Sequence, residues 1–471
     1  MTQKPVLLWL RRDLRLSDHP ALTAAVQTGA PIIPVFIRDP LVDAMGRAPK
    51  WRLERALSHL QGNLEAVGSA LIQRSGDALE ELQKLVRETG AGAVYWSRDY
   101  TPASIKRDTR VKAALKDAGV EARSFKGFLL FEPPSVQTQQ GSYYKVYSPF
   151  WRAVRNIHVE AILPRLAKLP APDAWPVSEK LTDWGLGKAM NRGAAVIANH
   201  TAVGEQAAQD KLAAFLTNAV EGYKADRDFM AKPATSGLSE YLTYGEISAR
   251  QIWHAGRRAM EEGASGAEHF LKELVWREFS YHLAYHTPHL LDRNWKDGWD
   301  DFPWGGEDAP HVKSWKMGRT GVPLVDAAMR EMYITGKMHN RARMIAASYL
   351  TKHLMVDWKV GLNWFADCLT DWDPAANALG WQWVAGCGPD AAPFFRIFNP
   401  ETQCAKFDPD GTYIHRWIAE GQPNPGATAL SYFDAIPRGW GLCADGAYPD
   451  PVVGLKEGRE RALQAYHATR G

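Results

Sequence analysis

The sequence predicts two unlike parts: an α/β domain with a doubly wound parallel sheet, followed by a large all-α domain. In the first hundred residues, the short apolar runs VLLWL, PIIPVFI, SALIQRS and AVYWS alternate with helical patterns. This alternation is typical of a parallel sheet covered by helices. From about residue 203 onward, apolar residues recur every three or four positions instead, which is the period of amphipathic helices. One such run is RARMIAASYLTKHLMVDW (341–358).

The chain has 471 residues, which is enough for two domains with large cores. We expect the α/β domain to span residues 1–130. Within it, DALEELQKLVRETG (77–90) predicts a helix that begins at Asp77 and ends at Gly90. Residues 131–202 are rich in Pro, Gln and Tyr at their start and have no long periodicity, so they predict an interdomain linker with short helices. Residues 203–471 then form the helical domain.

Several classes of function are disfavoured by what the sequence lacks. No GxGxxG follows the first strand and no GxxxxGK[ST] occurs, so the α/β part is not expected to bind NAD or ATP. The four cysteines have no CxxC spacing, so we expect no metal site and a reducing compartment. No window approaches the run of about 20 apolar residues that spans a membrane, and no signal peptide is recognisable. We therefore expect a cytoplasmic protein without a membrane partner.

Tryptophan is unusually frequent, with 19 residues against 16 Phe and 16 Tyr. The segment DWDPAANALGWQWVAG (371–386) combines three indoles with two acids and an amide. Trp381 and Trp383 would point in different directions on a helix and to the same side on an extended segment. These indoles are compatible with core packing. A file of indoles can also conduct an electron by short hops.

Three other groups of residues indicate binding or chemistry. FLKELVWREF (270–279) places an acid, an indole and a guanidinium on one helical face, which also suits an ordinary solvated face. ATSGLSEYL (234–242) offers hydroxyls and amides before a helix, as an anion site or a plain helix cap does. The net charge of +3 is too small to indicate nucleic-acid binding by itself, so a DNA partner needs a local basic patch. Basic residues do cluster in one stretch, although such a run is often only solvated: Lys313, Lys316, Arg319, Arg330, Lys337, Arg341 and Arg343.

In combination, these motifs resemble the photolyase/cryptochrome family, and within it the bacterial cyclobutane pyrimidine dimer photolyases. The similarity runs from about residue 5 to about residue 465. Its motifs are WLRRDLRLSDHPAL (9–22), ATSGLSEYL (234–242), KELVWREF (272–279), VPLVDAAMREM (322–332), MHNRARM (338–344), DWDPAANALGWQW (371–383) and AAPFFRIFNP (391–400).

The resemblance implies that the helical domain holds FAD in a U shape. Arg343 is similar to the arginine that pairs with Asp371 near the flavin ring. Asn377 corresponds to the residue that faces the central-ring nitrogen, where an amide accepts from a protonated nitrogen without adding negative charge. Trp372 has no further matching role. The implied cofactor-binding residues are Tyr223, Thr235, Ser236, Gly237, Leu238, Ser239, Arg343, Asp371, Trp372, Asp373 and Asn377.

The resemblance also implies a substrate: UV-damaged DNA whose pyrimidine dimer is flipped into the site. Extrusion is easier for a dimer, because the damaged pair is already poorly stacked. Glu273 would hydrogen-bond the dimer's carbonyls, most effectively as a neutral acid. We expect the protein to act as a monomer. The implied substrate- and DNA-binding residues are Arg227, Glu273, Trp276, Arg277, Asn340, Arg341, Met344 and Trp383.

Light-driven electron transfer from reduced FAD to the dimer is the implied reaction, with Glu273 and Asn377 as catalytic residues. Trp381, Trp358 and Trp304 match the tryptophan chain from flavin to surface.

An antenna pigment would absorb light in the α/β domain. The segment WSRDYTPASIKRD (96–108) lacks the Asn–Glu pair of enterobacterial folate-binding members. The chain is closer to the class III branch, which implies 5,10-methenyltetrahydrofolate, while a deazaflavin or FMN remains open.

Two alternatives remain open. A (6-4) photolyase would place two histidines in the segment equivalent to residues 338–344, where this chain has only His339. A cryptochrome-type blue-light sensor of the plant kind carries Asp at the position of Asn377. Such sensors usually add a long C-terminal tail, which we do not expect here.

Overall fold

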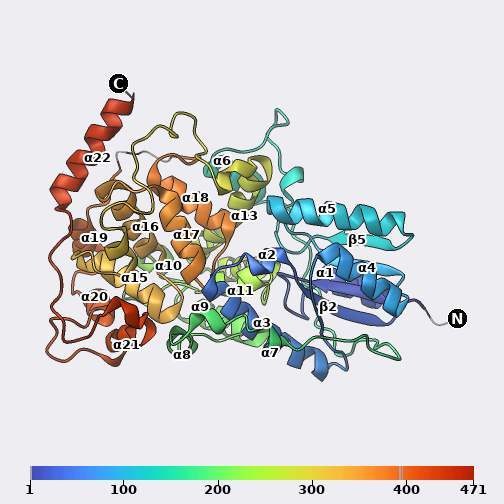
Figure 1. Ribbon diagram of the computed structural model, residues 1–471. Helices are drawn as coiled ribbons and strands as arrows, with labels where there is room; N and C mark the ends of the chain where they lie inside the picture. Colours follow the sequence, from blue (N-terminus) through green and yellow to red (C-terminus); the bar gives the residue numbers. More distant parts are fainter. Residues whose placement is uncertain (1–2, 392–393, 395, 471) are drawn as a thin grey trace.

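The computed structural model describes residues 3–391, 394 and 396–470. A parallel sheet with its covering helices lies beside a larger helical part, as Figure 1 shows, so the predicted fold class is confirmed. Three residues of the AAPFFRIFNP motif lie outside the described residues: Ala392, Pro393 and Phe395. Within the described ranges, no helix is both long and apolar enough to span a membrane.

The sheet has five parallel strands in the order β3-β2-β1-β4-β5. Every residue of the central strands β1 and β4 is buried, because helices cover both faces of the sheet. Strands buried on both faces read as continuous apolar runs, which explains VLLWL and AVYWS. The strands are β1 Val6–Leu10, β2 Ile32–Arg38, β3 Ile72–Ser75, β4 Ala93–Ser97 and β5 Glu121–Phe125.

Local capping signals set the ends of the helix predicted at residues 77–90. The Asp77 carboxylate accepts hydrogen bonds from the amides of Leu79 and Glu80, and Gly90 closes the helix with a φ of 65°. Both are the residue types that favour these cap positions. The helices of this part are α1 Pro20–Gln27, α2 Pro40–Asp43, α3 Arg47–Ala66, α4 Ala78–Thr89 and α5 Pro102–Asp117.

Residues 131–202 contain only short helices. The backbone of this stretch bonds along the α/β part, for example from Leu169 N–H to the Val67 carbonyl and from Glu179 N–H to the Gln73 carbonyl. The domain boundaries themselves stay a prediction. The short helices are η1 Pro133–Ser135, α6 Tyr147–Val154, α7 Leu181–Trp184, η2 Lys188–Met190 and α8 Gly193–Ala198.

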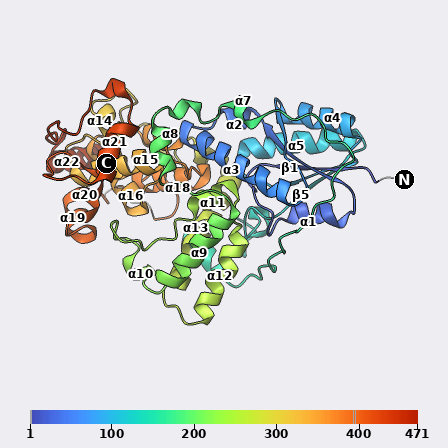
Figure 2. The same ribbon diagram turned by 90° about the horizontal axis from the view of Figure 1, so that it is seen from below.

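The helical part packs around two hydrophobic clusters. One cluster is built largely on α15, α16 and α17, and the other on α12 and α13, which lie side by side in Figure 2. The helices are α9 Glu205–Asn218, α10 Tyr223–Asp226, α11 Ser239–Tyr244, α12 Ala249–Glu261, α13 Ala267–His286, η3 Pro288–Leu291, α14 Val312–Lys316, α15 Pro323–Thr335, α16 Asn340–Ser348, η4 Tyr349–His353, α17 Trp358–Cys368, α18 Pro374–Ala385, α19 Pro400–Phe407, α20 Thr412–Trp417, α21 Ala427–Ala435, η5 Arg438–Trp440 and α22 Leu455–Arg470.

The motif that follows β1 joins the two parts of the molecule. Arg12 donates hydrogen bonds to the Thr243 carbonyl, the Tyr281 hydroxyl and the Asp373 carboxylate. The backbones meet so closely that a Cβ on Gly245, whose φ is +69°, would lie 2.1 Å from the Arg12 carbonyl oxygen. Only glycine fits such a contact at a positive φ. The α/β part thereby fixes the end of α11 and the start of α18.

Candidate active site

Helix α18 carries residues expected to contact the cofactor and also a residue expected to contact the DNA. Asp373 caps its N-terminus by accepting a hydrogen bond from the Ala376 amide at 3.0 Å, and Pro374 occupies the first turn. Because the segment is helical, Trp381 and Trp383 point in different directions. The Trp381 side chain is buried, whereas Trp383 is half-buried and lies 5.6 Å from the guanidinium of Arg396. One helix can thus present an indole to the interior and another to a ligand.

The expected pair between Arg343 and Asp371 is present. The Arg343 Nη2 donates to both oxygens of the Asp371 carboxylate, at 2.9 and 2.7 Å. The Ser239 hydroxyl donates to the same carboxylate at 2.7 Å. The pair therefore ties α16 and the start of α11 to the segment before α18. Charge-assisted hydrogen bonds of this kind hold a buried carboxylate in one orientation.

Asp373 is held by groups from distant parts of the chain. Its carboxylate accepts from Arg12 at 2.8 Å and from Tyr281 at 2.7 Å. Burial alone would raise the pKa of Asp373, but the charges of Arg12 and Arg277 and the hydrogen bonds lower it below its ordinary value. Arg12 lies inside a recognised motif, but its partner is 361 residues away, so nothing local in the sequence assigned its role.

Asn377 offers one acceptor to a ligand. Its Nδ2 donates to the Asp373 carbonyl at 2.9 Å, four residues earlier on the same helix. In the described part of the chain no donor bonds its Oδ1, and the side chain is largely buried. The amide can therefore accept a hydrogen bond from an N–H group of a bound molecule. This is the chemistry that a protonated flavin nitrogen requires.

The residues expected to contact the cofactor, most of which lie in the segment before α11, differ in how far they are exposed to solvent. Thr235 and Ser239 are exposed, whereas Leu238 is buried in the core, so only its backbone can contact a cofactor. Trp372 is partly buried and packs against the core, as a structural residue does. The Tyr223 ring is buried, with its edge against Phe270 at 5.9 Å. Their contact with a cofactor stays a prediction.

On α13, Glu273 forms an ion pair with Arg227 and lies 3.8 Å from His269. Burial would lower the pKa of Arg227, but the hydrogen bond and charge of Glu273 outweigh it and raise the pKa. Glu273 is thus ion-paired in this structure, and the neutral acid expected there stays a prediction. One turn along the helix, Trp276 stacks on Tyr147, with 3.7 Å between ring centroids. The sequence did not single out His269 or Tyr147.

Helix α16 begins beside this group. The Asn340 amide contacts the Met344 sulfur at 3.9 Å, so these two residues lie together as expected. Arg341 pairs with Asp228 instead, and its place in the same sector stays a prediction. His339 caps the helix by accepting from the Arg341 amide, and burial lowers the pKa of this imidazole to about 4. At neutral pH the imidazole is uncharged and adds no positive charge to the site.

The structure gives carboxylate partners to Arg277 and to most of the basic run at residues 313–343. Arg277 turns toward the Phe128 carbonyl at 3.1 Å and pairs with Glu278, so it is not grouped with Trp276. Its contact with DNA stays a prediction. The basic run at residues 313–343 is not a free phosphate patch, because a sequence shows cations but not their partners. Six of its seven members form ion pairs: Lys316, Arg319, Arg330, Lys337, Arg341 and Arg343.

The three indoles of the predicted chain lie on segments that adjoin in space. A Cβ on Gly361 would lie 2.0 Å from the Trp381 ring, so that ring packs on α17 one turn beyond Trp358. The segments at Trp304 and Trp358 are joined by backbone bonds between Gly305 and residues 355 and 357. Trp381 and Trp358 are buried, whereas Trp304, the last of the order, is half-buried. Conduction through them stays a prediction.

Within the described residues, no group of three or more His, Cys, Asp or Glu side chains could hold a metal ion. The site instead combines an Arg–Asp pair in which one guanidinium nitrogen donates to both carboxylate oxygens, a helix-capping carboxylate, a buried amide acceptor and stacked aromatics. Together with an α/β domain docked on a helical domain, these residues define a class of two-domain flavoproteins. The acceptor at Asn377 fits a flavin ring, and the exposed hydroxyl of Thr235 fits a diphosphate.

Comparison with known proteins gives the family. A model described as DNA photolyase matches residues 6–173, and one described as the FAD binding domain of DNA photolyase matches residues 270–468. The chain is 46% identical to the deoxyribodipyrimidine photo-lyase of Agrobacterium fabrum, over 99% of this chain and 98% of that protein. It is 33% identical to cryptochrome-1 of Arabidopsis thaliana, over 98% of this chain and 70% of that protein.

Solved structures agree with this result. The bacterial class III photolyase from Agrobacterium tumefaciens superposes with a TM-score of 0.92 at 45% identity, covering 100% of this chain and 98% of that one. The archaeal photolyase from Sulfolobus tokodaii, which was solved with two FAD molecules, gives 0.80 at 27% identity, covering 98% of this chain and 100% of that one. The chain therefore belongs to the photolyase/cryptochrome family and carries that family's FAD-binding domain.

Proposed function

We propose that the protein is a deoxyribodipyrimidine photo-lyase, which uses light to split cyclobutane pyrimidine dimers in DNA. The observation that carries the proposal is the arrangement of α18. Asn377, the acceptor suited to a flavin, lies fewer than two turns before Trp383, the half-buried indole expected against the dimer. A helix rises about 1.5 Å per residue, so cofactor and substrate would lie close together.

The cofactor is FAD, and the residues named above would hold it. When bound and reduced, it supplies the light-driven electron that opens the cyclobutane ring and then returns. Arg343 orients the Asp371 carboxylate, and Arg12 orients that of Asp373. Asn377 accepts from a protonated ring nitrogen without placing a negative charge beside it. Thr235, Ser236, Gly237, Leu238 and Ser239 would surround the diphosphate.

The substrate is UV-damaged DNA with the dimer flipped out of the helix. Trp276 and Trp383 would supply aromatic surface for the two damaged bases, and Asn340 and Met344, which contact each other, would also line the lesion pocket. Glu273 lies where it can hydrogen-bond carbonyl oxygens that gain charge. Its pair with Arg227 places a guanidinium at the same point, which would further stabilise negative charge there.

Trp381, Trp358 and Trp304 would return electrons to oxidised FAD from the surface. The antenna pigment is 5,10-methenyltetrahydrofolate in this proposal, with a deazaflavin or FMN as alternatives. The similarity to a class III photolyase supports this branch of the family. We further propose that the protein acts as a monomer in the cytoplasm.

A cryptochrome-type sensor and a (6-4) photolyase are the competing functions. Both share the fold, so single residues discriminate between them. Asn377 favours repair over a plant-type sensor, and the single His339 disfavours the (6-4) reaction. The relatives named as photo-lyases also match at higher identity than the cryptochromes, at 46% against 33%.

The test compares Glu273→Ala with Glu268→Ala, a control on the exposed side of the same helix that removes only a surface pair with Lys272. The measurement is the number of thymine dimers repaired per absorbed photon by chemically reduced protein, with FAD content determined in parallel. Glu273→Ala should lower the yield with FAD still bound, and Glu268→Ala should not. An unchanged yield in Glu273→Ala would remove this carboxyl from the mechanism.

A further inference from the structure

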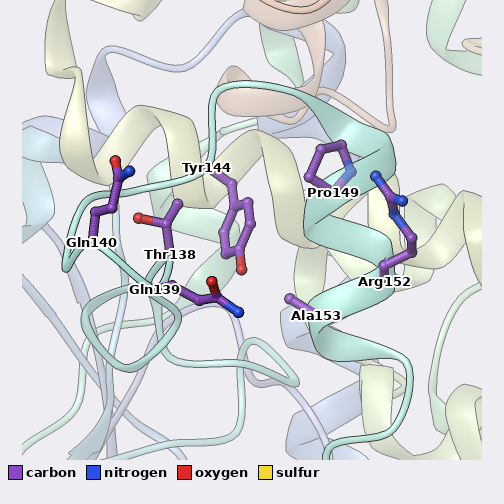
Figure 3. A pocket seen from close by; sticks show the side chains of 7 residues that line it. All are labelled: Thr138, Gln139, Gln140, Tyr144, Pro149, Arg152 and Ala153. Atoms are coloured by element: carbon purple, nitrogen blue, oxygen red, sulfur yellow. The ribbon is translucent and has the colours of Figure 1, made fainter.

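A groove lies beside the substrate face, between the turn at residues 138–140 and helix α6. Figure 3 shows the Tyr144 ring in the middle of it, with Thr138 and the Gln139 and Gln140 amides on one side. Arg152 lies on the α6 side. The groove is open to solvent and has a volume of about 470 Å³. That volume falls within the range of pockets that bind small molecules or single nucleotides.

The groove contains the three kinds of group that bind a nucleotide. A half-buried tyrosine ring gives a surface on which a base can stack. The exposed amides of Gln139 and Gln140 carry both donors and acceptors, which suits the edge of an unpaired base. The exposed guanidinium of Arg152 is suited to a phosphate.

Charge around the groove favours a polyanion. The chain between Glu132 and Glu160 contains no acidic residue but three basic ones, Lys145, Arg152 and Arg155. Among the described residues, none of these three cations forms an ion pair. This differs from the basic run at residues 313–343, whose cations are largely neutralised by carboxylates. Counterion release on phosphate binding therefore favours this surface over that run.

Helix α6, which forms one side of the groove, contacts residues expected around the dimer. Tyr147, in the first turn of α6, stacks on Trp276 of α13 at 3.7 Å. Its amide donates to Asp390, in the segment after the helix that bears Trp383. In Figure 1, α6 lies beside α13. DNA that places a dimer on Trp276 would thus continue toward the groove.

We propose that this groove is a second nucleotide subsite, which takes an unpaired nucleotide of the substrate DNA next to the flipped dimer. The proposal rests on the proposed function, because the position of the dimer defines where the neighbouring nucleotide lies. The nucleotide comes either from the damaged strand beside the lesion or from the opposite strand, whose bases lose their partners when the dimer is extruded. In either case the chemistry is the same: ring stacking, amide hydrogen bonds and one phosphate contact.

The experiment measures the dissociation constant of dimer-containing DNA in the dark, as single strand and as duplex, over a range of NaCl concentrations. Arg152→Gln should weaken binding about 5- to 10-fold at about 0.1 M salt and reduce the log–log salt slope by about one. Gln140→Ala, on an exposed turn, should weaken binding less and leave the slope unchanged. Arg87→Gln, an exposed arginine on α4 of the α/β part, is the matched control and should change nothing.

The two forms of DNA separate the two sources of the nucleotide. A loss confined to duplex assigns the groove to the opposite strand, and a loss in both forms assigns it to the damaged strand. Unchanged affinity and salt slope in Arg152→Gln and Gln140→Ala would overturn the proposal. So would loss of a near-UV-absorbing pigment with DNA affinity intact, which would make the groove an antenna site. Because binding is measured in the dark, absence of repair would contradict the proposed function and not this inference.

Discussion

Replacement of Arg52 by Met should destabilise the protein more than loss of any exposed ion pair. Arg52 belongs to α3 and is fully buried, and its guanidinium pairs with Glu240 at 2.8 Å and with Glu246. Both carboxylates belong to the helical part, and both are fully buried. Glu240 directly follows Ser239, which bonds Asp371 in the candidate active site. The cluster therefore connects the domain interface to the expected cofactor site.

The magnitude follows from the carboxylates that the substitution leaves behind. Removal of one partner from a buried ion pair typically costs about 3–5 kcal/mol, because an uncompensated charge remains in a low-dielectric environment. Lys337, 2.8 Å from Glu240, partly compensates one carboxylate, and the Gly204 amide donates to the other. We therefore expect Arg52→Met to lower the free energy of unfolding by about 3 kcal/mol, at the lower end of that range.

The same helix provides a matched control. Arg47 also bridges α3 to the helical part, through Asp367, but its side chain is 45% exposed. Exposed pairs contribute about 0–1 kcal/mol, so Arg47→Met should change stability little. The assay is urea unfolding followed by circular dichroism and by flavin fluorescence. Equal losses in the two variants would refute the argument that burial determines the cost.

The pH dependence gives an independent check. Burial raises the pKa of Glu246, and the charge of Arg52 opposes this rise. A carboxyl with a raised folded-state pKa adds stability that is fully present below the unfolded value of 4.5 and is lost as the pH rises through the folded value. Without Arg52 the folded value rises further. Arg52→Met should therefore be least destabilised near pH 5 and most destabilised near pH 8, and the opposite trend would contradict the account.

Three further predictions concern the site and its surroundings. Trp381→Phe should block photoreduction of oxidised FAD, because phenylalanine is much harder to oxidise than indole, and should spare repair by chemically reduced protein. Arg343→Leu leaves Asp371 without its cation and should weaken FAD binding at least about tenfold, measured by flavin retention on gel filtration. Burial raises the pKa of Glu278 to about 7, so the neutral carboxyl stabilises the folded protein below pH 4.5. This stabilisation is lost as the pH rises through 7. Glu278→Gln should flatten that part of the stability profile.

Each variant has a control or a result that would contradict it. Trp253→Phe alters a buried indole of α12 outside the predicted chain, which packs against Trp151, and should photoreduce normally. Normal photoreduction in Trp381→Phe would show that the electron path is misassigned. Full flavin retention in Arg343→Leu would show that the pair with Asp371 does not support the cofactor. A wild-type pH profile in Glu278→Gln would assign the titration to another group.

Local patterns predicted the fold well where local interactions determine it. The helix at residues 77–90 has the predicted ends, because Asp77 and Gly90 cap it with their own side chain and φ angle. The run at residues 341–358 was predicted as one helical stretch, but α16 ends at Ser348 and a π-helix follows. There the backbone at Val356 pairs with Gly305, a distant contact that periodicity does not reveal.

The sequence motifs predicted the residues of the site, but they did not predict which distant side chains bond to those residues. The Arg343–Asp371 pair was expected, since both residues lie in recognised segments. The role of Arg12 at Asp373 joins the two parts of the molecule, so no local pattern could assign it. The same limit applies to the basic run at residues 313–343, for which the sequence left phosphate binding and a merely solvated surface both open. Charges are visible in a sequence, but the carboxylates that neutralise them are brought by the fold.

Repair of a thymine-dimer oligonucleotide tests the central claim most directly. The purified, chemically reduced protein is mixed with the oligonucleotide under blue light, and an identical sample is kept in the dark. The account predicts that intact thymines reappear only in the illuminated sample and that repair continues over many turnovers. Absence of repair from protein that holds reduced FAD and binds the DNA would contradict the account and favour a light sensor.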